Sequence, residues 1–322
     1  MSFLARGVAA CLVALAAAPA CAQESYPTRG VRIILPFAPG SILDTLTRVI
    51  ADGLQRKWGQ SVVVENIAGS GGNAGTERFS RSAPDGYTLL SAPPGPMTVN
   101  KLLFRDIGYD AATFAPIAIT GKVPNALTVR KDFPASDFPG YVEYARKNPG
   151  KVSYGSQGAG STPFFVAKML EQRAGVEMLH VPYRGSALAQ NDISAGVLDS
   201  FFDAISNALP LARGGNARIL AITDTERSPL APDAPTVASY YPGFRSISWF
   251  AFAAPPGTNQ SLVDRISADI ALVLSEPATK ARLTEIGLTP VGSRPPEAAR
   301  FIREEDEMWS QLIRTLKIGR AH

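Results

Sequence analysis

Two turns in this 322-residue chain combine proline, glycine and hydroxyl residues in a pattern that lets backbone N–H groups approach an anion. The first, PFAPGSILD over residues 36–44, places Ser41 three positions before Asp44, the spacing of a helix N-cap. The second, YGSQGAGSTP over residues 154–163, offers Ser161 or Thr162 as a cap. Each turn would aim unpaired N–H groups and the positive end of a helix dipole at the end of a strand. The pair predicts a clamp for a small anion; two ordinary tight α/β turns are the alternative.

Two charged residues at predicted strand ends could complete such a site. Arg184 follows one strand and could meet a carboxylate with two hydrogen bonds, although an exposed loop arginine is the other interpretation. Asp203 closes another strand and could orient a ligand amine or a loop, or cap the next helix.

The sequence offers little for nucleophilic or metal chemistry. It contains no G-x-S-x-G turn, and its two histidines are His180 and the terminal His322. His180 lies at the end of a buried strand, where a hydrogen-bonded structural histidine is favoured over a general base. Both cysteines, Cys11 and Cys21, precede residue 23. We therefore predict no catalytic residue, no metal site and no cofactor.

Two further motifs resemble ligand-binding motifs but do not predict a nucleotide or calcium site. Gly69, Gly71 and Ala74 imitate a dinucleotide fingerprint, but the next strand ends without the acidic residue that would hold a ribose. The acidic run Glu304–Glu307 is predicted to be the solvated face of a helix and not a calcium site.

Composition limits the class of protein. With 45% hydrophobic residues the chain can bury the cores of two domains, and its net charge of +4 is too small to argue for a nucleic-acid partner. Residues 1–22 combine Arg6, an apolar segment and Ala20-Cys21-Ala22, as in a secretory signal peptide that is cleaved before Gln23. No later stretch is long and apolar enough to span a membrane. We expect an exported, periplasmic protein.

The elements that position these residues alternate between strand and helix. Residues 31–92 predict a parallel sheet with crossover helices. Two short strands, Ile117–Thr120 and Ala126–Val129, follow with Gly121 and Pro124 between them, and lead into a second alternating domain. The apolar run Ser246–Ala254 brings the chain back, and the helices after residue 260 complete the first domain.

The predicted fold class is therefore α/β, with two lobes that each hold a mostly parallel sheet flanked by helices, and with two crossing strands as the hinge. The predicted divisions are a signal peptide at 1–22, lobe 1 at 23–122 plus 247–322, and lobe 2 at 123–246.

Seven motifs in order cover nearly the whole mature chain: PFAPGSILD, GQSVVVENIAGSGGNAG, APDGYTLL, NPGKVSYGSQGAGSTP, HVPYRGS, RSPLAPDAPTVA and SWFAFAAPPGT. Together they resemble the extracytoplasmic solute-binding receptors of tripartite tricarboxylate transporters, the Bug family. The resemblance implies a periplasmic binding protein, monomeric and without a cofactor, that closes two lobes on a small carboxylate and delivers it to membrane permease subunits.

The resemblance also implies the ligand-binding residues, which lie on loops of both lobes: Phe37, Pro39, Gly40, Ser41, Asp44, Ser91, Ala92, Ser156, Gly158, Gly160, Ser161, Thr162, Arg184, Gly185, Ala187 and Asp203. Three positions depart from the family pattern. Ser41 stands where a second glycine is usual, Phe164 where many members have histidine, and Ala204 where asparagine follows the aspartate. These departures leave the ligand open among dicarboxylates, tricarboxylates, amino acids and aromatic acids.

Two other functions fit the same scaffold. One is an exported hydrolase or isomerase that acts on a carboxylate substrate. The other is a ligand-sensing receptor that feeds a signalling partner instead of a permease.

Overall fold

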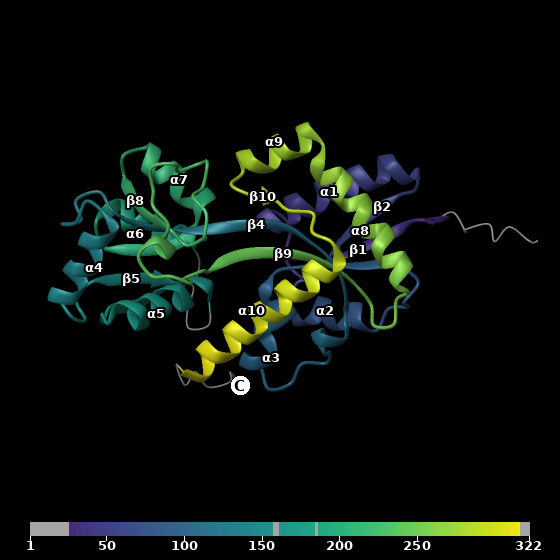
Figure 1. Cartoon of the computed structure of the whole chain (residues 1–322), viewed down its shortest axis with the longest axis horizontal. Helices are drawn as coiled ribbons and strands as arrows, with labels where there is room; N and C mark the ends of the chain where they lie inside the picture. The colour runs from purple at the N-terminus through teal and green to yellow at the C-terminus, as the bar shows by residue number, and fades with distance from the viewer. Residues whose placement is uncertain (1–25, 157–160, 184–185, 316–322) are drawn as a thin grey trace, which may run out of the picture.

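A single mixed sheet runs through the molecule and joins its two halves. The computed structural model describes residues 26–156, 161–183 and 186–315. Within them, ten strands form the order β2-β1-β3-β9-β4-β7-β5-β6, and β8 and β10 both pair with β4. Figure 1 shows one lobe around β1, β2 and β3, called the first lobe, and a second around β5, β6 and β7, with β4 and β9 passing between them. The predicted two-lobed α/β fold with crossing strands is confirmed.

The first lobe is built around β1 (Val31–Leu35), which pairs in parallel with β2 (Val62–Asn66) and β3 (Thr88–Ala92). Successive strand side chains point to opposite faces, so Ile33 and Ile34, both fully buried, enter different cores. Ile33 packs in the core with residues of α1 (Ile42–Trp58), α8 (Gln260–Ser275) and α9 (Pro277–Glu285). Ile34 packs in the core with residues of α2 (Asn73–Ser80) and α10 (Pro295–Thr315). This strand is buried on both faces, as the sequence predicts.

The first crossing element differs from its prediction. The two short strands expected at residues 117–120 and 126–129 are one 16-residue strand, β4 (Ala115–Arg130). Gly121 does not break it, because it lies against β10 (Thr289–Pro290), where a Cβ would be 2.8 Å from Leu288 Cδ2. Two register shifts against β9 (Ile247–Ala254) lie earlier in the strand, between Pro116 and Ala118 and between Ile119 and Gly121, and Pro124 pairs in register with Ile247.

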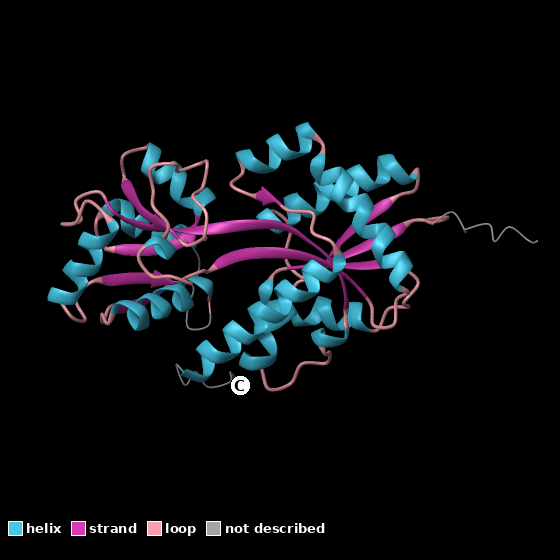
Figure 2. Cartoon of the chain, in the orientation of Figure 1, coloured by secondary structure: helices cyan, strands magenta, loops and turns pink. Residues whose placement is uncertain are grey.

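The second lobe repeats the α/β pattern. Its strand β5 (Ser153–Ser156) pairs in parallel with β6 (Leu179–Pro182) and β7 (Ser200–Ala204), while β4 runs antiparallel to β7 and to β8 (Ala217–Ile222). Four helices complete the lobe: α4 (Phe138–Lys147), α5 (Thr162–Ala174), α6 (Ser186–Ala195) and α7 (Ile205–Arg213). Figure 2 shows the helices (cyan) on both sides of the strands in each lobe.

Short helical turns fill the remaining loops. A π-helical turn (Gly95–Val99) continues directly into α3 (Asn100–Leu103), in a stretch for which the sequence predicts no regular element. The 3-10 turns are η1 (Ser70–Gly72), η3 (Ala111–Thr113) and η4 (Val237–Ser239).

The long helix α10 contacts both lobes. Its Ala298 packs in the core of the first lobe, while Trp309, Leu312 and Ile313 pack in that of the second. In Figure 1 it crosses in front of β9. The helix expected to complete the first lobe therefore also ties the second lobe to it.

The prediction that Glu304–Glu307 forms a solvated face is wrong for Glu305, which is 1% exposed. Consecutive helical residues are turned by about 100° from one another, so four acids in a row cannot all face solvent on a helix that packs against a sheet. The Glu305 carboxylate accepts hydrogen bonds from Arg245 Nη2 (2.6 Å) and Trp249 Nε1 (2.8 Å).

The predicted signal peptide lies outside the described residues. In the part of the chain that the structure describes, no helix is both long and apolar enough to cross a membrane. Those same residues contain no group of three or more His, Cys, Asp or Glu side chains arranged to hold a metal ion.

Candidate functional site

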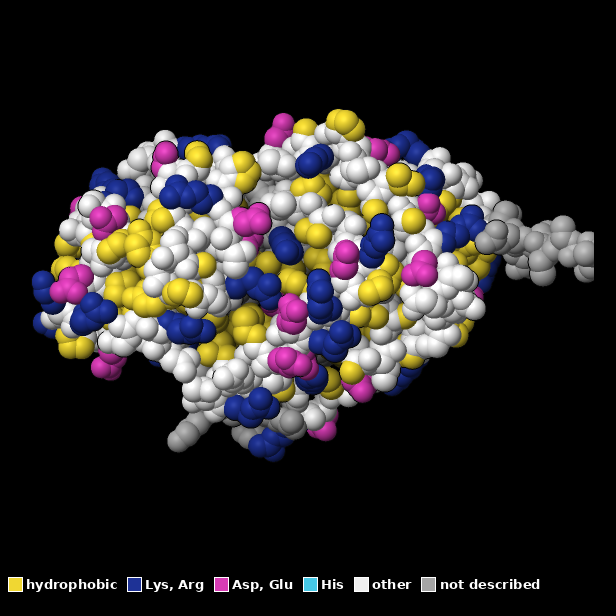
Figure 3. All heavy atoms as spheres, in the orientation of Figure 1, with side chains coloured by type: hydrophobic (Ala, Val, Ile, Leu, Met, Phe, Trp, Pro, Cys, Tyr) yellow, Lys and Arg dark blue, Asp and Glu magenta, His cyan; other side chains and the backbone are white. Residues whose placement is uncertain are grey.

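A cavity of about 570 Å³ lies between the two lobes, beside the crossing strands. Its volume falls within the range of pockets that hold small molecules. Figure 3 shows hydrophobic side chains in the hollow between the two halves of the molecule. Residues from both lobes line the cavity: Phe37, Gly40, Ser41, Ile42, Leu43, Pro93, Pro94, Gly95, Val99, Asn100, Leu103, Val123, Thr162, Phe165, Ala204, Asn207, Ser248, Phe250 and Trp309.

The first predicted turn borders this cavity at the N-terminus of α1. Ser41 is the N-cap, with φ −81° and ψ 165°, and its Oγ accepts a hydrogen bond from Asp44 N at 3.1 Å. Asp44 Oδ2 accepts in return from Gly40 N at 3.1 Å, and Gly40 has a φ of +92° that favours glycine. Phe37, Gly40 and Ser41 line the cavity. Pro39 and Asp44 lie in the same turn but outside the lining.

Asp44 holds this turn in shape. It is 6% exposed and also accepts hydrogen bonds from Arg48 Nε and Asn66 Nδ2, each at 3.1 Å. Burial alone would raise the pKa of the Asp44 carboxyl, but the hydrogen bonds from Arg48, Gly40 and Asn66 together keep that pKa below its usual value. Asp44 is therefore a charged brace for the loop that presents Ser41.

The second predicted turn leads into α5, and part of it meets the same cavity. Thr162 lines the cavity, and Ser161 is the N-cap, whose carbonyl oxygen accepts from Phe165 N at 3.1 Å. Ser156 is fully buried outside the lining, and its Oγ lies 2.6 Å from His180 Nε2. Gly158, Gly160, Arg184 and Gly185 lie outside the described residues.

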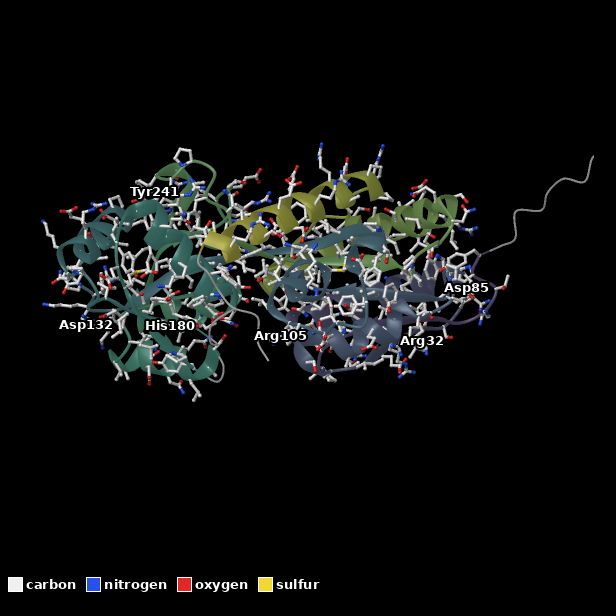
Figure 4. The ribbon with its side chains drawn as sticks, turned by 90° about the horizontal axis from the view of Figure 1, so that it is seen from below. Arg32, Asp85, Arg105, Asp132, His180 and Tyr241 are labelled. Atoms are coloured by element: carbon white, nitrogen blue, oxygen red, sulfur yellow. The ribbon has the colours of Figure 1, made fainter. Side chains whose placement is uncertain are left out.

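His180 makes the contacts of a structural residue, but the predicted buried strand is wrong: β6 lies at the edge of the sheet, and its Leu179 is 53% exposed. The His180 ring stacks on Tyr154 at 5.1 Å, and Figure 4 places it in the second lobe, at the far end of the molecule from Arg32 and Asp85. Burial lowers the pKa of the imidazole, and the nearby Lys168 lowers it further.

Asp203 acts behind the cavity wall. Its carboxylate is 6% exposed and accepts hydrogen bonds from Gln190 Nε2 (2.9 Å), Asn207 Nδ2 (3.1 Å) and Ala204 N (2.8 Å). Burial raises the pKa of this carboxyl, against the lowering effect of those hydrogen bonds. Because Ala204 and Asn207 line the cavity, Asp203 positions the start of α7.

The other predicted positions in the described residues are not on the lining of the cavity. Ser91 and Ala92 are fully buried in β3, and Ser91 Oγ is 2.7 Å from Thr47 Oγ1, whereas the following Pro93 and Pro94 do line the cavity. Ala187 is exposed on α6. Of the three departures from the family pattern, Ser41 and Ala204 line the cavity. Phe164 does not, and its ring packs 5.0 Å from that of His180.

Much of the lining was not among the predicted residues, and most of that part is apolar. Val123 and Phe250 come from the crossing strands, Leu103 from α3, Phe165 from α5 and Trp309 from α10. In the sequence these side chains have the pattern of core residues. Only Val99 and Leu103, one helical turn apart, suggest a small apolar face.

In the described part of the chain, three helix N-termini border this cavity. They belong to α1 in the first lobe, at Ile42 and Leu43, and to α5 and α7 in the second, at Thr162 and Asn207. The first N–H groups of a helix have no intrahelical partner and carry a partial positive charge. The arrangement can bind an anion between the lobes through dipoles and hydroxyl groups.

Comparisons with known proteins agree with this geometry. Residues 46–318 match the family described as tripartite tricarboxylate transporter family receptor. The chain is 34% identical over 301 residues to protein BugT of Bordetella pertussis, covering 92% of each protein. It is similar to the structure of R. palustris Rpa4515 with adipate (34% identity, TM-score 0.78, 92% of this chain and 100% of that one). It is also similar to MatC from Rhodopseudomonas palustris with bound malate (30% identity, TM-score 0.72, 89% and 100%).

Proposed function

Because this chain belongs to the tripartite tricarboxylate transporter receptor family, we propose that it captures a small organic carboxylate between its lobes and delivers it to the membrane permease of such a transporter. The observation that carries the proposal is the meeting of three helix N-termini, from both lobes, at one cavity. Two related structures contain dicarboxylates, adipate and malate. A carboxylate matches the donors that helix N-termini present.

The energetics are adequate for a transport receptor. A hydrogen bond to a charged group contributes about 1.5–3 kcal/mol. Micromolar affinity corresponds to about 8 kcal/mol, so a few such bonds, with the burial of apolar ligand surface, are enough after the cost of ordering. Ser41 and Thr162 are the proposed side-chain donors, one from each lobe.

Ligand binding would favour the form in which the lobes close about β4 and β9, and this form would be presented to the permease. The proposed locus is the periplasm, after removal of residues 1–22, with the protein acting as a monomer and without catalysis. We propose the lobe boundaries at residues 122 and 246.

The test is a thermal-shift and calorimetry screen of residues 23–322 against a panel of mono-, di- and tricarboxylates. A ligand that binds only the folded protein must raise its melting temperature. Thr162→Val, which removes a hydroxyl group from the cavity, should weaken the best ligand about tenfold. Its control is Thr225→Val on an exposed loop of the second lobe, which should leave binding unchanged. If no carboxylate binds, or if both variants bind equally well, the proposal fails.

A third measurement separates the receptor from an enzyme. The protein should leave every bound carboxylate, and the corresponding methyl esters, chemically unchanged over hours at micromolar protein concentration. Turnover of any of them would replace the receptor with the exported enzyme.

A further inference from the structure

We propose that the ligand has one carboxylate end and an apolar body, such as an aromatic ring or an aliphatic chain of about six carbons. This inference rests on the proposed function and narrows its ligand class. It comes from the apolar wall of the cavity, by which we mean the large apolar side chains from both lobes that line it together with the helix N-termini.

The aromatic part of this wall, made by Phe165, Phe250 and Trp309, is packed in place. The rings of Phe165 and Trp309 lie 5.1 Å apart at an angle of 59°, and each is no more than 2% exposed. Phe250 is 7% exposed and comes from β9. Because α5, β9 and α10 each supply one ring, the wall spans both lobes and would cover a ligand from two sides.

The polar group of Trp309 is turned away from the cavity. Its Nε1 donates to Glu305 Oε2 at 3.3 Å, and the same oxygen accepts from Trp249 Nε1 at 2.8 Å. The other carboxylate oxygen of Glu305 pairs with Arg245 Nη2 at 2.6 Å. An indole whose N–H is committed to a buried carboxylate presents only carbon atoms to a ligand.

The lining amides are committed in a similar way. Asn100 Nδ2 donates to Asn73 Oδ1 (2.6 Å) and to Gly71 O (3.0 Å), which uses both of its amide hydrogens. Asn207 Nδ2 donates one of its two hydrogens to Asp203 Oδ2 at 3.1 Å. Among the described lining residues, the groups left to meet a ligand are the helix N-termini with Ser41, Thr162 and the second amide hydrogen of Asn207, and the Ser248 hydroxyl. Most of this set is gathered at the helix N-termini, which matches one carboxylate.

An apolar body gains affinity against this wall, whereas a second carboxylate does not. Each buried methylene group should raise affinity about fourfold until the cavity is filled. A second carboxylate placed against Leu103 or Phe250 would lose its hydration without new partners. The structure therefore favours hexanoate or benzoate over adipate or malate.

The experiment is calorimetric titration of residues 23–322 with butanoate, hexanoate, octanoate, benzoate, adipate, malate and citrate. We expect affinity to rise about fourfold per methylene from butanoate to hexanoate, and hexanoate to bind at least tenfold more tightly than adipate. If adipate, malate or citrate binds more tightly than every monocarboxylate, this inference is overturned and the proposed function stands. If no acid binds, the proposed function itself fails.

A pair of variants tests the wall directly. Leu103→Gln places an amide group in the cavity and should weaken hexanoate about tenfold. The neighbouring Leu102 is also partly buried on α3 but does not line the cavity, so Leu102→Gln should change binding less than twofold. Melting temperatures without ligand show whether each variant folds. Equal affinities of folded Leu103→Gln and Leu102→Gln for hexanoate would contradict the claim that the apolar wall binds the body of the ligand.

Discussion

Replacing Glu305 by alanine should destabilise the protein strongly, although the acidic run around it suggests a tolerant surface. The carboxylate accepts hydrogen bonds from Trp249 Nε1 and Trp309 Nε1, on side chains that are 0% and 2% exposed. Alanine would leave both indole N–H groups without this acceptor, at about 1–3 kcal/mol each. The Arg245 side chain is 26% exposed and can turn to water, and the loss of a buried charge offsets part of the cost. We expect the free energy of unfolding to fall by about 2–5 kcal/mol.

The assay is thermal unfolding of the purified variants. For a chain of this size each kcal/mol shifts the melting temperature by about 1.5–2 °C, so Glu305→Ala should melt about 3–10 °C lower. Glu304→Ala is the matched control, because the Glu304 side chain is 54% exposed and its nearest cation, Arg300, is 3.9 Å away. That variant should lose less than about 0.5 kcal/mol. If the two variants melt at the same temperature, the buried cluster does not stabilise the protein as argued.

Glu305→Ala should also weaken ligand binding, because Trp309, which Glu305 holds in place, lines the cavity. This expectation follows from the burial of Glu305, which the sequence predicts to be solvated. Titration of the variant with the best ligand measures it, and an unchanged affinity would show that Trp309 does not need this hydrogen bond.

Further predictions concern pH, the first turn and a close backbone approach. Burial raises the pKa of Glu305, so the stability that this group contributes is present below its unfolded pKa of about 4.3 and is lost as pH rises through the folded pKa. The wild type should therefore lose stability with rising pH relative to Glu305→Gln. Melting temperatures of the two proteins that run parallel from pH 4 to 8 would contradict this. The pKa of Asp44 is lowered, chiefly by Arg48, Gly40 and Asn66 acting against burial, so its contribution is present above its unfolded value of about 3.9 and is lost as pH falls through the folded value. Asp44→Asn should lack that acid sensitivity, measured by melting between pH 2.5 and 5. Ser41→Ala removes the N-cap acceptor of Asp44 N and should lower the free energy of unfolding by about 1 kcal/mol, whereas Ser41→Gly should lower it by only a few tenths of a kcal/mol. Equal losses for the two variants in urea unfolding would show that Ser41 does not stabilise α1 as an N-cap. A Cβ at Gly75 would lie 2.6 Å from Ile67 O, so Gly75→Ala should lower the free energy of unfolding by about 1–3 kcal/mol. An unchanged melting temperature would show that the loop at Ile67 moves to make room for the methyl group.

Sequence reasoning recovered the order of the elements because it depends on local signals. The helices at residues 42–58 and 138–147 begin and end where their N-caps and apolar spacing place them. It failed at β4, where Gly121 packs against β10 and Pro124 pairs in register with Ile247 of β9, so that neither residue ends the strand. The partner residues of β9 and β10 lie more than 100 positions away along the chain, so the sequence around β4 does not indicate them.

The candidate site divides in the same way. Ser41 and Thr162 could be predicted because helix caps and turns depend on the types of a few consecutive residues. Phe165, Phe250 and Trp309 could not, because an apolar residue that lines a cavity has the same local pattern as one in a core. That Ser91, Ser156, Ala187 and Asp203 touch a ligand stays a prediction, because none of the four lines the cavity in the described structure.

The sequence by itself determined the α/β alternation, the two lobes, the family and two helix starts that border the cavity. Only the tertiary structure decided that the C-terminal helix passes from one lobe to the other, buries Glu305 between two tryptophans and brings Trp309 to the cavity. The physical reason is that helical periodicity tells which side chains share a face. It does not tell which other segment packs against that face. Packing between segments that are distant in the sequence decides whether an acid is solvated or buried, and whether an aromatic ring fills a core or lines a site.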